Sequence, residues 1–249
     1  MYTIAISNRK GGAGKTATAA ALGAYLSSRY RVLYVDLDDQ GNLSYSTGAG
    51  NAGKGIYDAI RNPRNTADMI THAAEGDILA STPALGEPEA MRSPWDVSRA
   101  LETVKGNYDF CVIDTAPALG MGLINALTAA DGLLIPAQAD IYSYGGISQL
   151  ENAIDAVKGN TNRDLEILGI LITFYNARTV LSRDITEATE ELAESLGTRL
   201  LRSRIRACNA IREAAIRRIN IFKYSPRSNA AKDYGEAAEE LLKIIGGKQ

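Results

Sequence analysis

The sequence holds few of the residues that build disulfide frameworks, metal clusters or membrane spans. Its 249 residues include two cysteines and one histidine, too few for a disulfide scaffold, a four-thiolate site or a histidine-built metal site. The longest weakly charged stretch, about 116–130, is interrupted by Pro117 and Asn125. It is also shorter than the roughly 20 apolar residues of a spanning helix. We therefore expect one soluble globular domain over residues 1–249, with no membrane segment.

The chain also lacks an overall charge bias and an export signal. It carries 27 basic and 29 acidic residues, so its net charge gives no reason to expect a polyanionic partner. Residues 1–6 have the pattern of a β-strand, without the basic head, apolar stretch and cleavage site of a secretory signal. We expect a cytoplasmic location. We also expect no N-terminal helix-turn-helix, since the chain starts at its first strand.

Short apolar runs rich in valine and isoleucine alternate with longer helical stretches. The runs cover residues 3–7, 32–36, 110–114, 133–136 and 168–173, and the expected helices cover 15–28, 95–105, 121–130, 144–158, 181–196 and 230–245. Strands buried on both faces of a parallel sheet have this composition. Alternation with helices predicts crossover connections. We expect an α/β fold, a mostly parallel twisted sheet with helices on both faces, to which residues 66–95 add a short edge strand and a surface excursion.

A glycine-rich loop follows the first strand and precedes an alanine-rich helix. Its residues are Lys10, Gly11, Gly12, Ala13, Gly14, Lys15 and Thr16, with Ala17 next. Strand, loop and helix form the context of a phosphate loop, in which backbone N–H groups and the helix N-terminus surround a phosphate. Lys15 then reaches the β- and γ-phosphates, and the Thr16 hydroxyl binds Mg²⁺. We predict phosphate contacts from residues 10–17, although Arg9 replaces the glycine of the standard pattern.

Two lysines in one phosphate loop, Lys10 and Lys15, resemble the deviant Walker A motif, Lys-Gly-Gly-x-Gly-Lys-Thr, of the ParA/MinD family of ATPases. The resemblance extends over most of the chain and is closest to ParA/Soj-type partitioning proteins. It implies a P-loop fold that uses ATP and Mg²⁺, and a homodimer that encloses two ATP molecules. In that family the first lysine reaches the partner's nucleotide, so Lys10 is expected to act in trans. A cation there stabilises the charge of the transferring phosphoryl group.

Three aspartates follow two of the expected strands, at the sheet edge where ligands of open α/β folds bind. Asp36 and Asp38 alternate along the second run and so share one side of it. This segment resembles the family's switch I, which implies that Asp38 positions the attacking water and that Asp36 lies near Mg²⁺. Asp39 replaces the family's proline, so either the loop is more mobile or hydrolysis is slower. Asp114 ends an apolar strand as a Walker B carboxylate does, and we predict that it faces the cation.

The residues that hold the base are less well defined. Residues 173–179 correspond to a family segment that passes the base. Asn176 is expected to hydrogen-bond the adenine edge, and Arg206 is expected to cover the ring. Tyr175 suits packing as well as stacking. The residues themselves do not exclude guanine, so the preference for ATP rests on the resemblance.

Basic residues concentrate near the C-terminus. Residues 199–227 hold nine basic residues and one acid, Glu213, a net charge of +8, while the rest of the chain carries −10. Arginines suit phosphate oxygens, and a dimer would present the cluster twice. Since ParA-type ATPases bind nonspecific DNA when dimerised by ATP, we predict DNA contacts from Arg178, Arg202, Arg204, Arg212, Arg217 and Arg218. The alternative is a solvated helix face with internal ion pairs.

The expected function is partitioning of a plasmid or chromosome by a Mg²⁺-dependent ATPase with weak intrinsic turnover, associated with the nucleoid. Lys10, Lys15 and Asp38 are its expected catalytic residues. The resemblance also implies a ParB-like centromere-binding adaptor that stimulates hydrolysis. One alternative is a MinD-like switch that acts on a membrane or a protein complex, although residues 241–249 have no aromatic anchors. Another is a regulator that binds ATP but hardly hydrolyses it.

Overall fold

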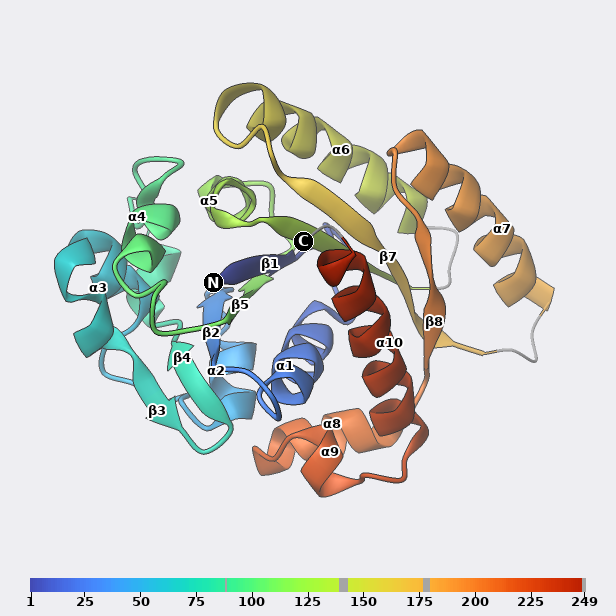
Figure 1. The fold of residues 1–249 in the computed structure, drawn as a ribbon, viewed down its shortest axis with the longest axis horizontal. Helices are drawn as coiled ribbons and strands as arrows, with labels where there is room; N and C mark the ends of the chain where they lie inside the picture. Colours follow the sequence, from blue (N-terminus) through green and yellow to red (C-terminus); the bar gives the residue numbers. More distant parts are fainter. Residues whose placement is uncertain (88, 139–142, 177–179, 248–249) are drawn as a thin grey trace.

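A single sheet forms the centre of the protein. The computed structural model describes residues 1–249 except 88, 139–142, 177–179 and 248–249, and of 143–148 and 180–184 it describes the backbone alone. Within these residues the sheet has eight strands in the order β3-β4-β2-β5-β1-β6-β7-β8 (Figure 1). They are β1 (Tyr2–Ile6), β2 (Val32–Leu37), β3 (Thr71–Ala73), β4 (Gly76–Leu79), β5 (Phe110–Thr115), β6 (Gly132–Gln138), β7 (Glu166–Tyr175) and β8 (Leu200–Arg206).

Every described pair of neighbouring strands is parallel except β3 and β4 at one edge. The expected mostly parallel α/β sheet is therefore confirmed. The parallel order brings the carboxyl ends of β1, β2 and β5 together, with Ile6 and Asp36 each paired to Asp114 in the register. That edge of the sheet carries the phosphate loop and the predicted carboxylates.

Helices cover both faces of the sheet (Figure 1). One apolar cluster joins the sheet to α1, α2, α8, α9 and α10, and the other joins it to α3, α4, α5, α6 and α7. The helices are α1 (Lys15–Leu26), α2 (Asn42–Thr47), α3 (Ile56–Arg61), α4 (Asp96–Glu102), α5 (Met121–Ala129), α6 (Ser143–Asn160), α7 (Val180–Ser195), α8 (Asn209–Arg217), α9 (Ile221–Tyr224) and α10 (Asn229–Gly246), with 3₁₀ turns at Pro63–Met69 and Pro83–Gly86.

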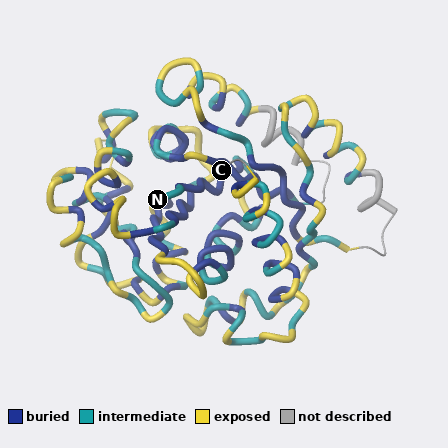
Figure 2. Tube along the Cα trace, viewed as in Figure 1, coloured by how far each residue is buried: buried dark blue, intermediate teal, exposed yellow. Residues whose placement is uncertain are grey.

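The central strands β1, β2, β5 and β6 are nearly continuous apolar runs because each contributes side chains to both clusters. In β1, Ala5 belongs to one cluster, whereas Ile4 and Ile6 belong to the other. Figure 2 shows this as central strands that are buried along their length. Full burial on both faces removes the period-two alternation of a half-exposed strand.

The expected surface excursion at 66–95 contains the short strands β3 and β4. Here β3 lies at the sheet edge and pairs with β4 in antiparallel register. No described helix is long and apolar enough to cross a bilayer.

Candidate functional site

The phosphate-loop residues connect β1 to α1 in a backbone path that requires glycine. Gly12 and Gly14 have φ angles of 77° and 87°, in the left-handed region that glycine adopts without steric cost. A Cβ atom on Gly14 would also lie 3.3 Å from Thr173 Cγ2. The Thr173 hydroxyl donates a hydrogen bond of 2.9 Å to the Ala13 carbonyl. Thr173, near the end of β7, thus contacts the phosphate loop and stabilises its conformation.

The two lysines of the loop have different surroundings. The Lys15 ammonium is buried and donates to the Lys10 carbonyl at 3.3 Å. Burial lowers the Lys15 pKa, while Asp114 and Asp38 act in the opposite direction. The Lys10 backbone N–H donates to Asn8 Oδ1 at 3.0 Å, which fixes the start of the loop. Lys15 is therefore held inside the loop next to two carboxylates.

Asp36 is buried at the end of β2 and anchors the start of α2. Its Oδ2 accepts hydrogen bonds from the Ser44 backbone N–H at 2.8 Å and from the Ser44 hydroxyl at 2.7 Å, and its Oδ1 accepts from the Asp38 N–H at 3.1 Å. Burial raises the Asp36 pKa to about 6 against these hydrogen bonds. Of Asp36 and Asp38, only Asp38 lines the neighbouring pocket.

Asp114 is fully buried, and neither of its carboxylate oxygens has a hydrogen-bond partner among the described residues. It pairs with Asp36 in the register of β2 and β5. Burial raises the Asp114 pKa, and so does the Asp36 charge, whereas the nearby Lys15 ammonium acts in the opposite direction. A buried carboxylate without a partner is costly unless a cation sits opposite it. The geometry therefore fits a bound cation in front of Asp114.

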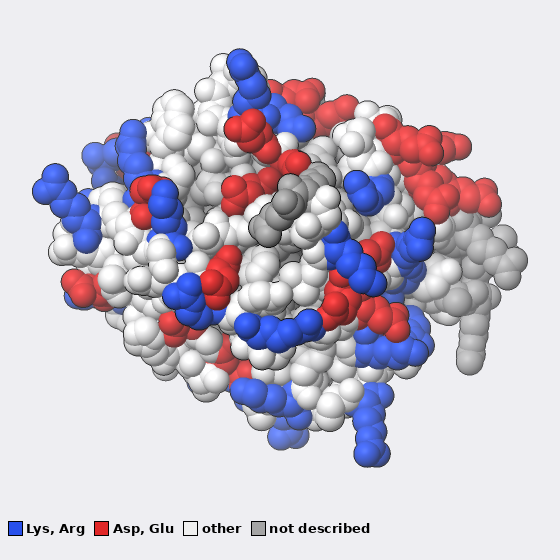
Figure 3. Space-filling model, in the orientation of Figure 1, with Lys and Arg blue, Asp and Glu red and all other residues white. Residues whose placement is uncertain are grey.

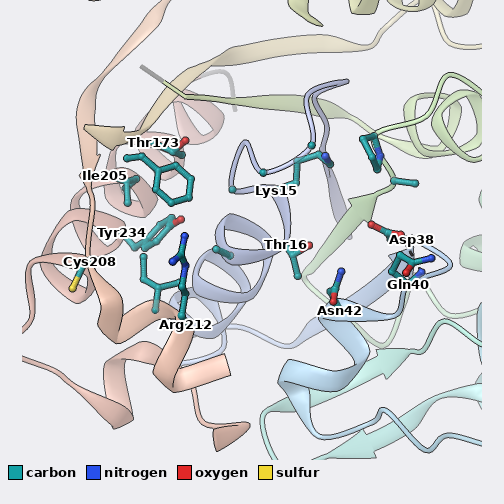
Figure 4. A pocket seen from close by; sticks show the side chains of 18 of the residues that line it. Lys15, Thr16, Asp38, Gln40, Asn42, Thr173, Ile205, Cys208, Arg212 and Tyr234 are labelled. Carbon is teal, nitrogen blue, oxygen red and sulfur yellow. Dashed lines mark hydrogen bonds between the residues drawn. The ribbon is translucent and has the colours of Figure 1, made fainter. Parts of the chain in front are cut away.

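Lys15, Thr16 and Asp38 line a cavity of about 730 Å³ above the phosphate loop (Figure 4), whereas Asp36 and Asp114 are not part of its lining. Lys15 and Thr16 lie in its middle, and Asp38, Gln40 and Asn42 lie on one side. Thr173, Ile205, Tyr234 and Arg212 lie on the other side. The volume falls within the roughly 300–1,000 Å³ of small-molecule pockets. One half of the cavity is therefore polar and charged, and the other half combines the apolar residues Phe174, Ile205, Ile211 and Tyr234 with Arg206 and Arg212.

The predicted base-binding residues are not equally close to the half that contains the apolar residues. Arg206 lines the cavity, but its guanidinium forms a bidentate ion pair with the buried Asp233 of α10, with Nη2 2.5 Å from Oδ1 and Nε 2.9 Å from Oδ2. Asn176 is exposed just after β7 and is not part of the lining. Four apolar lining residues on this side have no base contact predicted for them, namely Phe174, Ile205, Ile211 and Tyr234, although Phe174 lies within the segment 173–179 that is expected to pass the base. They come from four elements, so no local pattern joins them.

The structure divides the predicted DNA-binding arginines. Arg178 lies outside the described residues. Arg212, Arg217 and Arg218 are exposed on α8 and at its end, and Arg202 is exposed on β8. Arg204 is half-buried, and burial lowers its pKa. In Figure 3, basic side chains are visible over the α8 and α9 region, and acidic side chains gather over α7.

Some charges of the basic segment are compensated by acids from elsewhere in the chain. Arg206 pairs with Asp233, and Lys223 Nζ lies 3.2 Å from Glu75 Oε1. Arg217 and Arg218 instead lie over the rings of Tyr224 and Tyr45, at 5.7 Å and 4.5 Å from the ring centres. Ion pairs therefore neutralise part of the positive charge of residues 199–227, and the exposed arginines of α8 remain available for an anion.

Comparison with known sequences extends these observations over nearly the whole chain. A family described as an AAA domain matches residues 1–167. The chain is 37% identical to the sporulation initiation inhibitor protein Soj of Bacillus subtilis, over 96% of this chain and 97% of that protein. It is 34% identical to the chromosome-partitioning ATPase Soj of Thermus thermophilus, over 96% and 94% of the two chains.

Solved structures share the fold. The cobyrinic acid a,c-diamide synthase of Mycobacterium smegmatis, solved with a bound ATP analogue and magnesium, is 30% identical and superposes with a TM-score of 0.87, covering 100% of this chain and 97% of that chain. The cell division ATPase MinD of Pyrococcus furiosus is 25% identical, with a TM-score of 0.80 and coverage of 98% and 99%.

Proposed function

The chain belongs to the ParA/MinD family of P-loop ATPases, and on this basis we propose that it is a Mg²⁺-dependent ATPase that partitions a plasmid or a chromosome. The observation that carries the ATPase activity is Asp114, a buried carboxylate beside Lys15 and Thr16 whose oxygens accept no hydrogen bond in the described part of the chain. The partitioning role is supported by the Soj proteins, which the chain matches over almost their full length.

The residues around the loop fit Mg²⁺ bound together with ATP. No three His, Cys, Asp or Glu side chains in the described part of the chain converge to hold a metal by themselves. Nucleotide phosphates would therefore supply the remaining oxygen ligands, as is usual for Mg²⁺. The Thr16 hydroxyl and Asp114 would hold the ion directly or through water, with Asp36 beside Asp114. The bound ion polarises the γ-phosphate and offsets the charge that develops on it.

Each catalytic residue has a role in this proposal that follows from its position. Lys15, already inside the loop, binds the β- and γ-phosphates. Asp38, buried at the mouth of the cavity and held by the Gln40 backbone N–H at 3.1 Å from its Oδ1, orients the attacking water. Lys10 reaches the nucleotide of a second copy and stabilises the transferring phosphoryl group. Hydrolysis then depends on an ATP-bound homodimer.

The dimer binds DNA without sequence preference, through phosphate contacts of exposed arginines. Arg212, Arg217 and Arg218 are the main contacts in this proposal, with Arg202 and Arg178 beside them, and the half-buried Arg204 contributes least. A ParB-like adaptor stimulates hydrolysis, which removes the contacts that favour the dimer and releases the protein from DNA. The protein therefore acts in the cytoplasm, on the nucleoid.

Lys10→Ala tests the catalytic part of the proposal. The variant should bind ATP with nearly unchanged affinity and lose hydrolysis, because the trans contact is removed while Lys15 stays in place. Lys54→Ala, a change of an exposed lysine outside the phosphate loop, is the control. ATP affinity, phosphate release and dimer content by light scattering are measured together. Turnover that survives in Lys10→Ala would exclude the trans role.

DNA retention tests the partitioning part. With ATP, binding should fall steeply with salt, and the triple alanine variant of Arg212, Arg217 and Arg218 should reduce the slope by about one per lost phosphate contact. The control is the triple alanine variant of Arg64, Arg99 and Arg163, which are exposed elsewhere. If ATP-dependent binding is absent and the protein instead associates with vesicles, the MinD-like alternative replaces the proposal.

A further inference from the structure

Phe174, near the carboxyl end of β7, has a backbone conformation that aromatic residues rarely adopt. Its φ angle is 54°, in the left-handed region where a Cβ atom is crowded by the backbone. Among the described non-glycine residues only Arg218 shares this property. Strained conformations of this kind are concentrated at ligand sites, where the surrounding structure maintains them.

The strain coincides with a change in the register of β7 and β8. Ile172 pairs with Arg204, whereas Tyr175 pairs with Arg206. Between these pairs β7 advances by three positions and β8 by two, so β7 contains one extra residue at Thr173 or Phe174. A bulge of this type redirects a side chain relative to the regular alternation of the strand.

The redirected ring lies at the nucleotide pocket instead of in the core. β7 is buried from Leu168 to Thr173, and the next residue, Phe174, is 37% exposed and lines the cavity. A Cβ atom built on Gly14 would lie 3.6 Å from Phe174 Cε2, so the ring lies beside the last glycine of the phosphate loop. A large apolar side chain is thus held open to the ligand space next to the phosphate site.

The neighbours of Phe174 make this half of the cavity suitable for a flat, apolar group. Ile205, Ile211 and Tyr234 line it together with Phe174. Lys15 and Asp38 lie on the phosphate side of the cavity, whereas the Arg212 side chain lies on the side of Ile205 and Tyr234 (Figure 4). The Arg206 guanidinium is already paired with Asp233. Stacking of a base on the Phe174 ring therefore does not depend on Arg206. Aromatic rings stack on nucleobases of every kind.

We propose that Phe174 is the residue that selects a nucleotide over a bare polyphosphate, by stacking its ring on the base while the loop holds the phosphates. The inference rests on the proposed ATPase function and specifies how its site recognises the base. It assigns the base contact to Phe174 in place of Tyr175, whose backbone pairs with Arg206 in the sheet.

The test compares Mg·ATP with inorganic tripolyphosphate, which has the phosphates but no base, by calorimetry. Phe174→Ala should weaken ATP binding about tenfold, with tripolyphosphate affinity unchanged within about twofold, and Phe174→Tyr should retain ATP affinity. Phe174→Gly should weaken ATP equally without a larger fall of the unfolding midpoint than in the alanine variant, since glycine relieves the strain at this φ. Tyr175→Ala, the neighbouring aromatic, is the matched control and should bind ATP as the unmodified chain does.

A spectroscopic readout follows from the single tryptophan of the chain, Trp95. In a Trp95→Phe, Phe174→Trp double variant, ATP should change the emission of the new indole and tripolyphosphate should not. Unchanged or increased ATP affinity in Phe174→Ala, or an equal loss for both ligands, would overturn the stacking role. Failure of the unmodified chain to bind ATP would overturn the ATPase function as well.

Discussion

Asp36 and Asp114 are paired side by side on β2 and β5, yet only Asp36 is satisfied by hydrogen bonds. Ser44 provides two of the three donors to Asp36, and the same hydroxyl accepts a bond of 2.9 Å from the Ser81 N–H. The two carboxylates therefore differ in their surroundings: Asp36 connects the end of β2 to α2 through Ser44, whereas the Asp114 oxygens accept no hydrogen bond in the described part of the chain. This asymmetry leads to the first prediction.

Asp114→Asn should increase the stability of the ligand-free protein and lower its affinity for Mg·ATP. The change replaces a buried carboxyl that lies beside Asp36 and accepts no hydrogen bond in the described part of the chain, so we expect the free energy of unfolding to rise by about 1 kcal/mol. Thermal unfolding with and without Mg·ATP measures both effects. The Mg·ATP-induced rise in the midpoint should shrink strongly in the variant. A destabilised ligand-free variant would contradict this account of Asp114.

Thr173→Val tests the support that β7 gives to the phosphate loop. Valine has the shape of threonine, but it cannot donate the hydrogen bonds to the Ala13 and Ala137 carbonyls, which are 2.9 Å and 3.3 Å long. We expect a loss of about 1 kcal/mol in the free energy of unfolding and a several-fold weaker affinity for ATP and tripolyphosphate alike. Denaturant titration and calorimetry measure the two effects. Thr189→Val, which removes a buried threonine hydroxyl on α7, is the control, and it should leave ligand affinity unchanged.

The ion pair of Arg206 and Asp233 should respond differently to the loss of each partner. The Asp233 side chain is 5% exposed, and that of Arg206 is 41% exposed. Arg206→Met leaves a buried carboxylate without its partner, whereas Asp233→Asn leaves a guanidinium that water can reach. The unfolding midpoint should therefore fall more in Arg206→Met. Equal midpoints in the two variants would mean that the ion pair does not stabilise the contact between β8 and α10.

Acid should weaken the ion pair of Arg31 and Asp109, which connects the starts of β2 and β5. Hydrogen bonds from the Arg31 side chain, followed by its backbone N–H, lower the Asp109 pKa from 3.8 to about 2. Because the folded-state pKa is depressed, this contribution to stability is complete above about pH 4, and it is lost as the pH falls toward 2. Asp109→Asn should remove that part of the pH dependence. Unfolding midpoints between pH 2 and 6, compared with those of Asp68→Asn, an exposed aspartate, measure the difference.

Much of the phosphate side of the site could be predicted from the sequence because its signals are local. The loop from Lys10 to Thr16 and the aspartates at strand ends are short segments whose chemistry follows from the residues and their neighbours. The expected strands agree with the observed ones within about two residues at each end, because buried parallel strands are unbroken apolar runs.

The base side could not be predicted in the same way because it is assembled from distant elements. Phe174 lines the pocket owing to a bulge that depends on the register of β7 and β8, and register does not appear in the sequence of one strand. The acids Asp233 and Glu75, which pair with Arg206 and Lys223, lie outside the basic segment, so a local charge count overestimates its free charge. The short helices α2 and α9 span six and four residues, too few to display a helical period.

Opposite charges are separated on the surface, with acidic side chains on α7 and basic side chains on α8, so an electric field would orient the molecule. The described part of α7 exposes Glu187, Glu190, Glu191 and Glu194, while α8 and its end expose Arg212, Arg217 and Arg218. A chain with a formal net charge of −2 therefore has an appreciable dipole moment. A polyanion would turn the arginine side toward itself before contact, so added salt should slow the encounter, whereas a net charge of −2 alone would make added salt speed it up.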